Sequence, residues 1–467
     1  MLQKQLNLPP SFIASLEGLP GFDKEAFIEV HESGRQVTSI RFNPRKKHNA
    51  DQLDAEKSEL QTKISQQIPW CPYGYYLEER PSFTLDPYLH AGLYYVQEAS
   101  SMFLWYVLQH TVGSATAELK VLDLCAAPGG KSTLLASYFT DGLLVSNEVI
   151  KSRASILVEN ISKWGCSNAV VTNNDPKDFH RLPGYFDVIV VDAPCSGSGL
   201  FRRDTAAIEE WSENNVMLCS QRQQRILADV MPALKENGVF IYSTCSYSKE
   251  EDEEILDWLC ETFDVTSVQI PVPPQWNIVE VQSPGHKAFG YRFYPDKVDG
   301  EGLFMSAFVK KGDEDVFSQR KPQLTSIAKA EHAIVQEWLN HNESLFCCKQ
   351  GENIIAVPAI YQQDVALLQK HLYLRKAGVT VGAVKGKDLV PHHELALSLL
   401  LKDRFEKADL ELADALQYLR KADFSLNGSS LKGWVLASYK DANLGWMKVL
   451  PNRINNYYPT EWRILKA

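Results

Sequence analysis

The sequence predicts an α/β protein built around a doubly wound, mostly parallel sheet of the Rossmann-like kind, with smaller domains on both sides. Between residues 119 and 311, short apolar runs alternate with segments of helical periodicity, which is the pattern of a parallel sheet covered by helices. A glycine-rich turn follows the first apolar run, where such folds bind a cofactor. The 467 residues also exceed what one hydrophobic core organises, so further domains are expected.

The elements of the central sheet follow from these apolar runs. Strands are predicted at residues 120–125, 143–148, 169–173, 186–192 and 239–244. Helices are predicted at residues 131–139, 151–164 and 216–234. The acidic run 250–254 follows Ser248 in the chain, and Ser248 and Glu251 have the spacing of a capping box. We therefore expect this run to be the solvated start of a helix.

The flanking regions differ from the centre in composition. Residues 1–110 mix helix and strand signals, and 433–464 has the short strands, turns and aromatics of a small β-barrel. The predicted domains are an N-terminal appendage (1–110), a doubly wound central domain (111–312), a small intermediate domain (322–390) and a C-terminal domain (391–467). The pair His392–His393 has no spaced partner and is expected at the surface.

The bulk composition limits compartment and partners. No apolar run approaches the roughly 18 residues of a membrane span, and the first residues lack the apolar core of a signal peptide. Nine cysteines without a CxxC pair are typical of free thiols in a reducing compartment. We expect a cytoplasmic monomer with no membrane or metal partner. The net charge of −10 argues mildly against nucleic acid, but a basic stretch leaves room for a local RNA surface: Arg35, Arg41, Arg45, Lys46 and Lys47.

The turn after the first strand reads CAAPGGK. Its residues are the predicted cofactor loop: Cys125, Ala126, Ala127, Pro128, Gly129, Gly130 and Lys131. A P-loop would need glycine where Cys125 stands, and the GxGxxG of a dinucleotide fold is absent. S-adenosylmethionine has no pyrophosphate and needs fewer glycines, so it is the predicted cofactor.

Three acids at successive strand ends support that prediction. Glu148 ends the second strand, where a carboxylate can bind ribose hydroxyls, and Asp175 follows the third, where it can reach the adenine amino group. Asp192 ends the fourth strand. A single strand-end acid is as readily a helix cap, but three acids aligned with a glycine turn favour a cofactor crevice.

Two cysteines close the next strands at the same edge of the sheet. Cys195 lies in DAPCSG (192–197) and Cys245 in TCS (244–246), and packing explains such Gly/Ser/Pro-rich surroundings poorly. A thiolate can activate a cytosine by adding to C6, which gives C5 the carbanion character needed to accept a methyl group. Asp192 can hydrogen-bond N3 and the exocyclic amine during that addition. The base must also leave its stack, so an RNA loop or extruded base is expected.

Together, CAAPGGK (125–131), DAPCSG (192–197) and TCS (244–246) resemble the motifs of the NOL1/NOP2/Sun family of RNA 5-methylcytosine methyltransferases, and the resemblance covers most of the chain. The segments GLYYVQEASSM (92–102) and GEGLF (300–304) also resemble it. IPWC (68–71) and the aromatic C-terminus are similar to the bacterial RsmF-like branch. The resemblance implies a class I S-adenosylmethionine-dependent core, a PUA-like C-terminal module, and 16S ribosomal RNA or the 30S subunit as partner. It also implies that Cys245 attacks while Cys195 assists release.

Two other hypotheses stay open at this point. One is methylation of a different cytosine substrate, above all transfer RNA; DNA is disfavoured because a long recognition insert is missing. The other is a non-catalytic ribosome-assembly role, which retention of both thiols and all three acids argues against. A P-loop NTPase is the weakest hypothesis.

Overall fold

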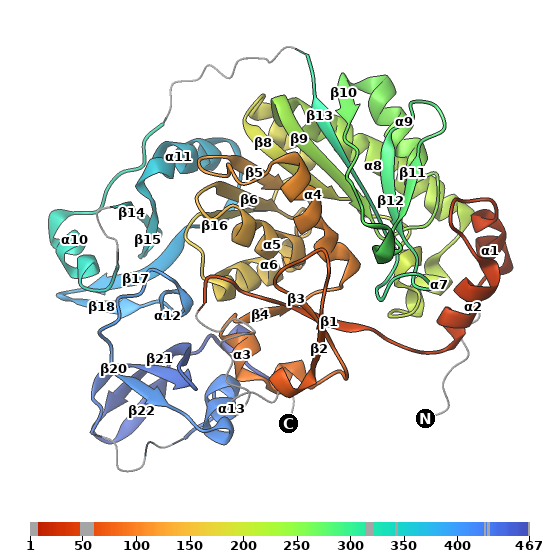
Figure 1. Cartoon of the computed structure of the whole chain (residues 1–467). Coiled ribbons are helices and arrows are strands. Elements are labelled where there is room, and N and C mark those ends of the chain that lie inside the picture. Colours follow the sequence, from red (N-terminus) through yellow and green to blue (C-terminus); the bar gives the residue numbers. More distant parts are fainter. Residues whose placement is uncertain are drawn as a thin grey trace.

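The computed structural model describes residues 8–46, 60–312, 322–340, 344–424, 426 and 430–465. A large central sheet is flanked by a small N-terminal sheet on one side and by two small C-terminal sheets (Figure 1). Within the described ranges, no helix combines the length and hydropathy needed to cross a bilayer.

The N-terminal region places a pair of helices and a four-stranded sheet, in the order β2-β3-β1-β4, against the catalytic core. Its elements are α1 (Pro10–Leu16), α2 (Lys24–Glu32), β1 (Thr38–Phe42), β2 (Ile64–Gln67), β3 (Gly74–Leu77), α3 (Pro87–His90), β4 (Tyr94–Val96) and α4 (Phe103–Thr111). Phe12 of α1 and Phe27 of α2 form one apolar cluster with Tyr247, two residues beyond Cys245. The helices therefore pack close to the end of the catalytic strand.

The basic stretch of this region does not form an RNA surface as a whole, contrary to expectation. Arg41 is 0% exposed, and its guanidinium donates to Thr133 Oγ1 at 2.6 Å and to Gln97 Oε1 at 2.7 Å. Lys46 Nζ donates to two backbone carbonyls. Both cations fasten the small sheet to the core, a role that charge patterning cannot reveal. Lys47 lies outside the described residues.

The central sheet has the order β11-β12-β13-β9-β8-β5-β6-β7-β16, with β10 pairing with β13. Its elements are β5 (Lys120–Asp123), α5 (Gly130–Tyr138), β6 (Leu143–Asn147), α6 (Lys151–Trp164), β7 (Ala169–Thr172), β8 (Phe186–Asp192), α7 (Ala206–Glu210), α8 (Glu213–Val230), β9 (Leu234–Thr244), α9 (Glu253–Thr262), β10 (Val265–Ser267), β11 (Val279–Gln282), β12 (Phe289–Phe293) and β13 (Leu303–Lys310). Strands β5 to β9 are mutually parallel, and β13 closes the sheet antiparallel to β9. The predicted fold class is confirmed. The strand order of the central sheet reverses between β5 and β8, and sheets of this kind bind ligands in a crevice at that point.

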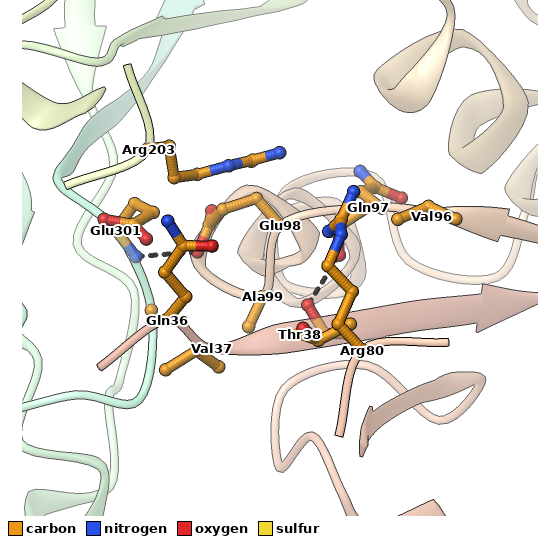
Figure 2. Close-up of a pocket in the computed structure, with 12 residues that line it drawn as sticks. Gln36, Val37, Thr38, Arg80, Val96, Gln97, Glu98, Ala99, Arg203 and Glu301 are labelled. Carbon is orange, nitrogen blue, oxygen red and sulfur yellow. Dashed lines mark hydrogen bonds between the residues drawn. The ribbon is translucent and has the colours of Figure 1, made fainter. Parts of the chain in front are cut away.

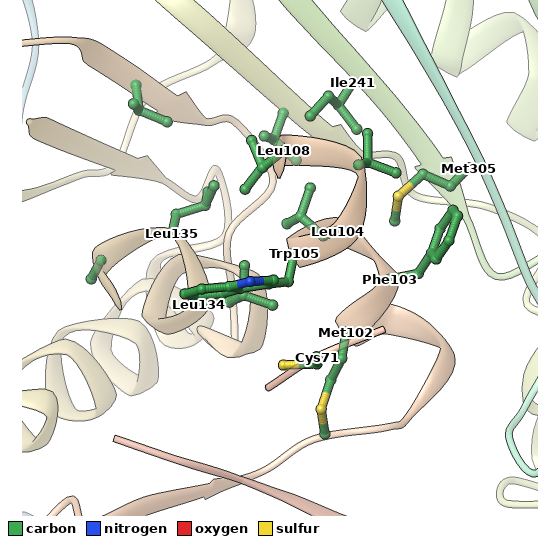
Figure 3. Close-up of a cluster of buried hydrophobic side chains, with 14 of the residues drawn as sticks. Cys71, Met102, Phe103, Leu104, Trp105, Leu108, Leu134, Leu135, Ile241 and Met305 are labelled. Carbon is green, nitrogen blue, oxygen red and sulfur yellow. The ribbon is translucent and has the colours of Figure 1, made fainter. Parts of the chain in front are cut away.

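Helix burial explains why this layering forms. Leu104 and Leu108 of α4 and Leu134 of α5 are 0% exposed and meet Ile241 of β9 and Met305 of β13 in one cluster (Figure 3). Full burial of each leucine side chain contributes about 1.5–3 kcal/mol. The cluster holds α4 and the cofactor helix α5 on the same face of the sheet.

The C-terminal region forms two four-stranded sheets and also extends the central one. Its elements are α10 (Lys329–Gln336), β14 (Leu345–Gln350), β15 (Asn353–Pro358), α11 (Gln362–His371), β16 (Leu374–Ala377), β17 (Val379–Lys385), β18 (Asp388–Pro391), α12 (His393–Leu397), β19 (Lys407–Asp409), α13 (Leu412–Arg420), β20 (Gly433–Tyr439), β21 (Ala442–Leu450) and β22 (Arg453–Asn456). Strand β16 pairs antiparallel with β7, so this region is attached to the catalytic sheet by backbone hydrogen bonds. His393 is 5% exposed and packs edge-on to Tyr458 and Trp462, so its expected surface position was wrong.

Candidate active site

The predicted cofactor loop forms the turn between β5 and α5. Gly129 precedes the helix with φ of 118°, a left-handed value that favours glycine. Helix α6 holds the turn from outside, because Arg153 Nη2 donates to Ala127 O and Asn160 Nδ2 donates to Pro128 O, each at 2.8 Å. The turn contains all the predicted loop residues: Cys125, Ala126, Ala127, Pro128, Gly129, Gly130 and Lys131.

The two acids predicted to bind the cofactor lie just after β6 and β7; Asp175 also caps the 3-10 turn that follows it, whereas Glu148 binds the backbone ahead of α6. Glu148 Oε1 accepts the Ile150 N–H at 2.8 Å, and Asp175 Oδ1 accepts the Lys177 N–H at 3.2 Å. For Asp175 the capping and cofactor interpretations are compatible, because the cap uses one carboxylate oxygen. Arg153 Nη1 lies 3.5 Å from Glu148 Oε2.

The crevice residues have the chemistry that S-adenosylmethionine needs. Val149 and Ile150 directly follow Glu148 and are 54% and 48% exposed, so apolar surface on which an aromatic ring can pack lies beside the Glu148 carboxylate. The unpaired N–H groups at the start of α5 and the buried Asp123 Oδ1, which has no hydrogen-bond partner, face the same loop. Burial raises the pKa of Asp123 to about 7.

The two predicted catalytic thiols meet at the carboxyl ends of β8 and β9. Cys195 Sγ and Cys245 Sγ are 3.0 Å apart. The hydrogen bond to Cys245, together with burial, raises the pKa of Cys195 well above its usual range. Either sulfur can be the donor in this contact, so the geometry places both thiols at one point without assigning the nucleophile.

The loops around the thiols approach one another through glycine. The Gly199 N–H donates to Cys245 O at 2.8 Å, and the Gly302 N–H donates to Gly199 O at 3.1 Å. A Cβ on Gly199 would lie 2.5 Å from Gly302 O and 2.9 Å from Cys245 O, so no other residue fits without moving the backbone. The position of the Cys245 backbone is fixed by this contact.

An ion pair adjoins the thiols. Lys131 Nζ lies 2.8 Å from Asp192 Oδ2, while Ser243 Oγ donates to Asp192 Oδ1 at 2.7 Å. Burial works against the charge of Lys131, but the carboxylate of Asp192 outweighs it and Cys245 adds to the effect, so the pKa of Lys131 is raised. Lys131, predicted only as a cofactor-loop residue, thus bridges the loop and the catalytic face. The Asp192 side chain is 37% exposed and is open to a substrate.

The segments 92–102 and 300–304, which carried part of the family resemblance, contact each other beside the thiols. The Glu301 N–H donates to Glu98 Oε1 at 2.9 Å, and Ser100 Oγ donates to Glu301 O at 3.0 Å. They enclose a polar pocket of about 30 Å³, room for a single water, which Arg80 and Arg203 also line (Figure 2). Burial raises the pKa of Glu301 to about 7.

Comparison with known proteins agrees with this arrangement. Three family models match: "16S rRNA methyltransferase RsmB/F" over residues 112–309, the N-terminal domain of 16S rRNA methyltransferase RsmF over 8–99, and the RsmF PUA domain over 405–464. A ribosomal RNA small subunit methyltransferase F from Vibrio atlanticus is 30% identical, and the alignment covers 84% of this chain and 85% of that one. The chain belongs to the RsmB/F family.

Further relatives extend the match over nearly the whole chain. The methyltransferase F of Psychromonas ingrahamii is 29% identical over 98% of both chains. A methyltransferase homologue from Pyrococcus horikoshii superposes with a TM-score of 0.51 at 27% identity, covering 65% of this chain and all of that one. As an RsmB/F member the chain is a methyltransferase with S-adenosylmethionine as its cofactor, and it has the predicted PUA-type C-terminal module.

Sequence reasoning misplaced one part of this RsmB/F site. The acidic run is not a solvated helix start, because Glu251 and Asp252 are 0% exposed and α9 begins only at Glu253. The predicted capping box is absent too, since Glu251 hydrogen-bonds to the cysteine loops and Ser248 Oγ has no partner. The apolar pair Val149–Ile150 was also missed, although its position directly after a strand-end acid was a usable signal.

Proposed function

We propose that this RsmB/F member methylates C5 of a cytosine in 16S ribosomal RNA through a covalent adduct between Cys245 and C6 of the base. The observation that carries the proposal is the pair of thiols 3.0 Å apart, at the strand ends beside the cofactor loop. A protein that only bound RNA would need neither sulfur there.

The groups around Cys245 suit an addition to the ring. Lys131 provides a cation beside the attacking thiolate, held in place by Asp192. Asp192, open to solvent, can hydrogen-bond N3 and the exocyclic amine of the cytosine. As Cys245 bonds to C6, the electron pair of the C5–C6 double bond moves to C5. S-adenosylmethionine supplies the methyl group that C5 accepts.

Cys195 is placed for the second half of the reaction. Its raised pKa depends first on the hydrogen bond to Cys245. Once the Cys245 sulfur is bonded to C6 it accepts that bond poorly, so the pKa of Cys195 falls and the thiol releases its proton to solvent water. Cys195 thiolate can then take the C5 proton, whose electron pair re-forms the double bond and expels Cys245 as thiolate. We therefore propose Cys195 as the residue that releases the enzyme from its product.

The remaining assignments follow the same proposal. Glu148 binds the ribose of the cofactor, Asp175 its adenine amino group, and the residues Cys125 to Lys131 its methionine end. Residues 1–110 guide RNA, 111–312 hold the catalytic centre, 322–390 form a small intermediate domain, and 391–467 bind RNA. The enzyme is proposed to act as a monomer, and the names of its relatives support 16S RNA or the 30S subunit as its substrate.

The test is methylation of separate RNA pools from a strain that lacks this enzyme. Purified protein and tritiated S-adenosylmethionine are incubated with 16S RNA, 30S subunits or transfer RNA, and nucleosides are separated. Labelled 5-methylcytidine in 16S or 30S material is the expected result. Label in transfer RNA alone would overturn the substrate, and no label in any pool would overturn the activity.

A further inference from the structure

The Cys195 loop (residues 193–199) and the Cys245 loop (residues 245–249) share one buried carboxylate. Glu251 is 0% exposed, and its Oε2 accepts Ser246 Oγ at 2.7 Å and Ser196 Oγ at 2.5 Å. Its Oε1 accepts the Ser196 N–H at 2.9 Å and Gln223 Nε2 at 3.0 Å. Ser196 directly follows Cys195, and Ser246 directly follows Cys245. The Glu251 side chain thus hydrogen-bonds to the residue that follows each cysteine.

Other residues near Cys245 are held by Asp252 of the acidic run and by Arg292 of β12. Thr244 Oγ1 donates to Asp252 Oδ1 at 2.7 Å, and Arg292 Nη1 donates to Tyr247 O at 2.9 Å. Asp252 and Arg292 form an ion pair of 3.2 Å. These contacts fix the Cys245 loop alone. The carboxylate of Glu251 differs because it spans both loops.

Burial raises the pKa of Glu251, and the hydrogen bonds that its carboxylate accepts favour the charged form and oppose that rise. Every partner that reaches the two oxygens is a donor, and such charge-assisted bonds are roughly twice as strong as neutral ones. Gln223 is itself oriented by Tyr242, whose hydroxyl donates to Gln223 Oε1 at 3.1 Å. Glu251 and the groups it binds thus form a clamp that is anchored through Gln223 to α8 and through Tyr242 to β9.

We propose that Glu251 is a positioning residue that sets the spacing of Cys195 and Cys245 by holding the residue after each of them. The inference rests on the proposed function for its catalytic meaning, but the spacing itself can be measured separately. Since a misplacement of about 1 Å can reduce catalysis about 100-fold, a carboxylate that fixes two sulfurs at once controls the rate without touching cofactor or RNA.

The test compares Glu251→Gln with Glu254→Gln, a matched change in the same acidic run at an exposed position. Glutamine keeps the size of the side chain but presents an amide N–H₂ to donors. We expect kcat to fall about 10- to 100-fold in Glu251→Gln with KM for S-adenosylmethionine and RNA unchanged, because only the placement of the thiols is altered. Glu254→Gln should match the wild type.

A second readout does not depend on methylation. Diamide oxidises two thiols to a disulfide, taking up both hydrogens, and its rate at Cys195–Cys245 can be followed by peptide mass mapping. Disulfide formation between Cys195 and Cys245 should be slower in Glu251→Gln than in the wild type, because the two sulfurs are no longer held close together. Ser246→Ala removes one hydrogen bond to Glu251. It should reduce the rates of methylation and of diamide cross-linking, but less than Glu251→Gln does, and it tests the positioning role if Glu251→Gln does not fold.

The outcomes separate the two claims. Equal kcat, or an equal Cys195–Cys245 cross-linking rate, in the clamp variant and in Glu254→Gln would overturn the positioning role. If the wild-type enzyme failed to methylate ribosomal RNA, the proposed function would fall, while the cross-linking rates would still decide whether Glu251 sets the spacing of the thiols.

Discussion

Gly199→Ala should disable the enzyme without unfolding it. The new methyl group would lie 2.5 Å from Gly302 O and 2.9 Å from Cys245 O, whereas ordinary contact begins at 3.4 Å. Both neighbours are backbone atoms, so relief requires a shift of about 0.9 Å in the loops that carry Cys245 and Gly302. A displacement of that size costs about 100-fold in rate, and overpacking costs about 1–3 kcal/mol of stability.

The assay is tritium incorporation into 30S subunits at saturating S-adenosylmethionine, together with thermal unfolding. We expect a large fall in kcat, a KM for the cofactor close to that of the wild type, and a folded protein. Gly197→Ala is the matched control in the same loop. Its φ of 78° strains an alanine by about 1–2 kcal/mol, but no atom lies within 4 Å of the added carbon. If Gly199→Ala kept wild-type kcat, the account of how Cys245 is fixed would be refuted.

Three further predictions concern the cofactor side and the N-terminal sheet. Burial raises the pKa of Asp123 from 3.8 to about 7, so the stability that its protonated form contributes is complete below about pH 4 and is lost as pH rises through 7. The melting temperature of Asp123→Asn should therefore change less between about pH 4 and 7 than that of the wild type, and parallel melting curves for the two proteins would contradict this. Glu148→Gln should weaken S-adenosylmethionine binding about 10-fold in calorimetry, as expected for about 1.4 kcal/mol of lost hydrogen bonding to ribose, with RNA binding unchanged; unaltered cofactor affinity would remove Glu148 from the site. Arg41→Met should lower the free energy of unfolding by about 3 kcal/mol in urea titration, because buried acceptors on Gln97 and Thr133 lose a charged donor. If Arg41 instead bound RNA at the surface, the substitution would leave stability intact and weaken RNA affinity.

The fold and most of the site could be predicted from local signals. The strand Phe186–Asp192 and the helix Lys151–Trp164 have the predicted bounds, since an apolar run and an amphipathic period are properties of the segment itself. Cys195 and Cys245 meet because parallel strands end at one edge, a rule that topology alone supplies.

The errors fall where a long-range partner overrides a local pattern. Ser248 and Glu251 have capping-box spacing, yet Glu251 finds stronger partners in Ser196, 55 residues away, and in Gln223. Arg41 looked like part of a basic surface, but its side-chain partners are Gln97 and Thr133, which lie 56 and 92 residues further along the chain. Neither contact is visible from composition or periodicity, because each depends on which loops the finished sheet brings together.

The role of Cys245 is the central claim, and a trapped adduct tests it most directly. Cys195→Ala is incubated with 16S RNA or 30S subunits and S-adenosylmethionine, denatured, digested with nuclease and protease, and analysed by peptide mass mapping. We predict a stable adduct in which the peptide containing Cys245 carries a methylated cytidine, and no such adduct or methylation in Cys245→Ala. Methylation by Cys245→Ala at the wild-type rate, or an adduct on a different cysteine, would contradict the account.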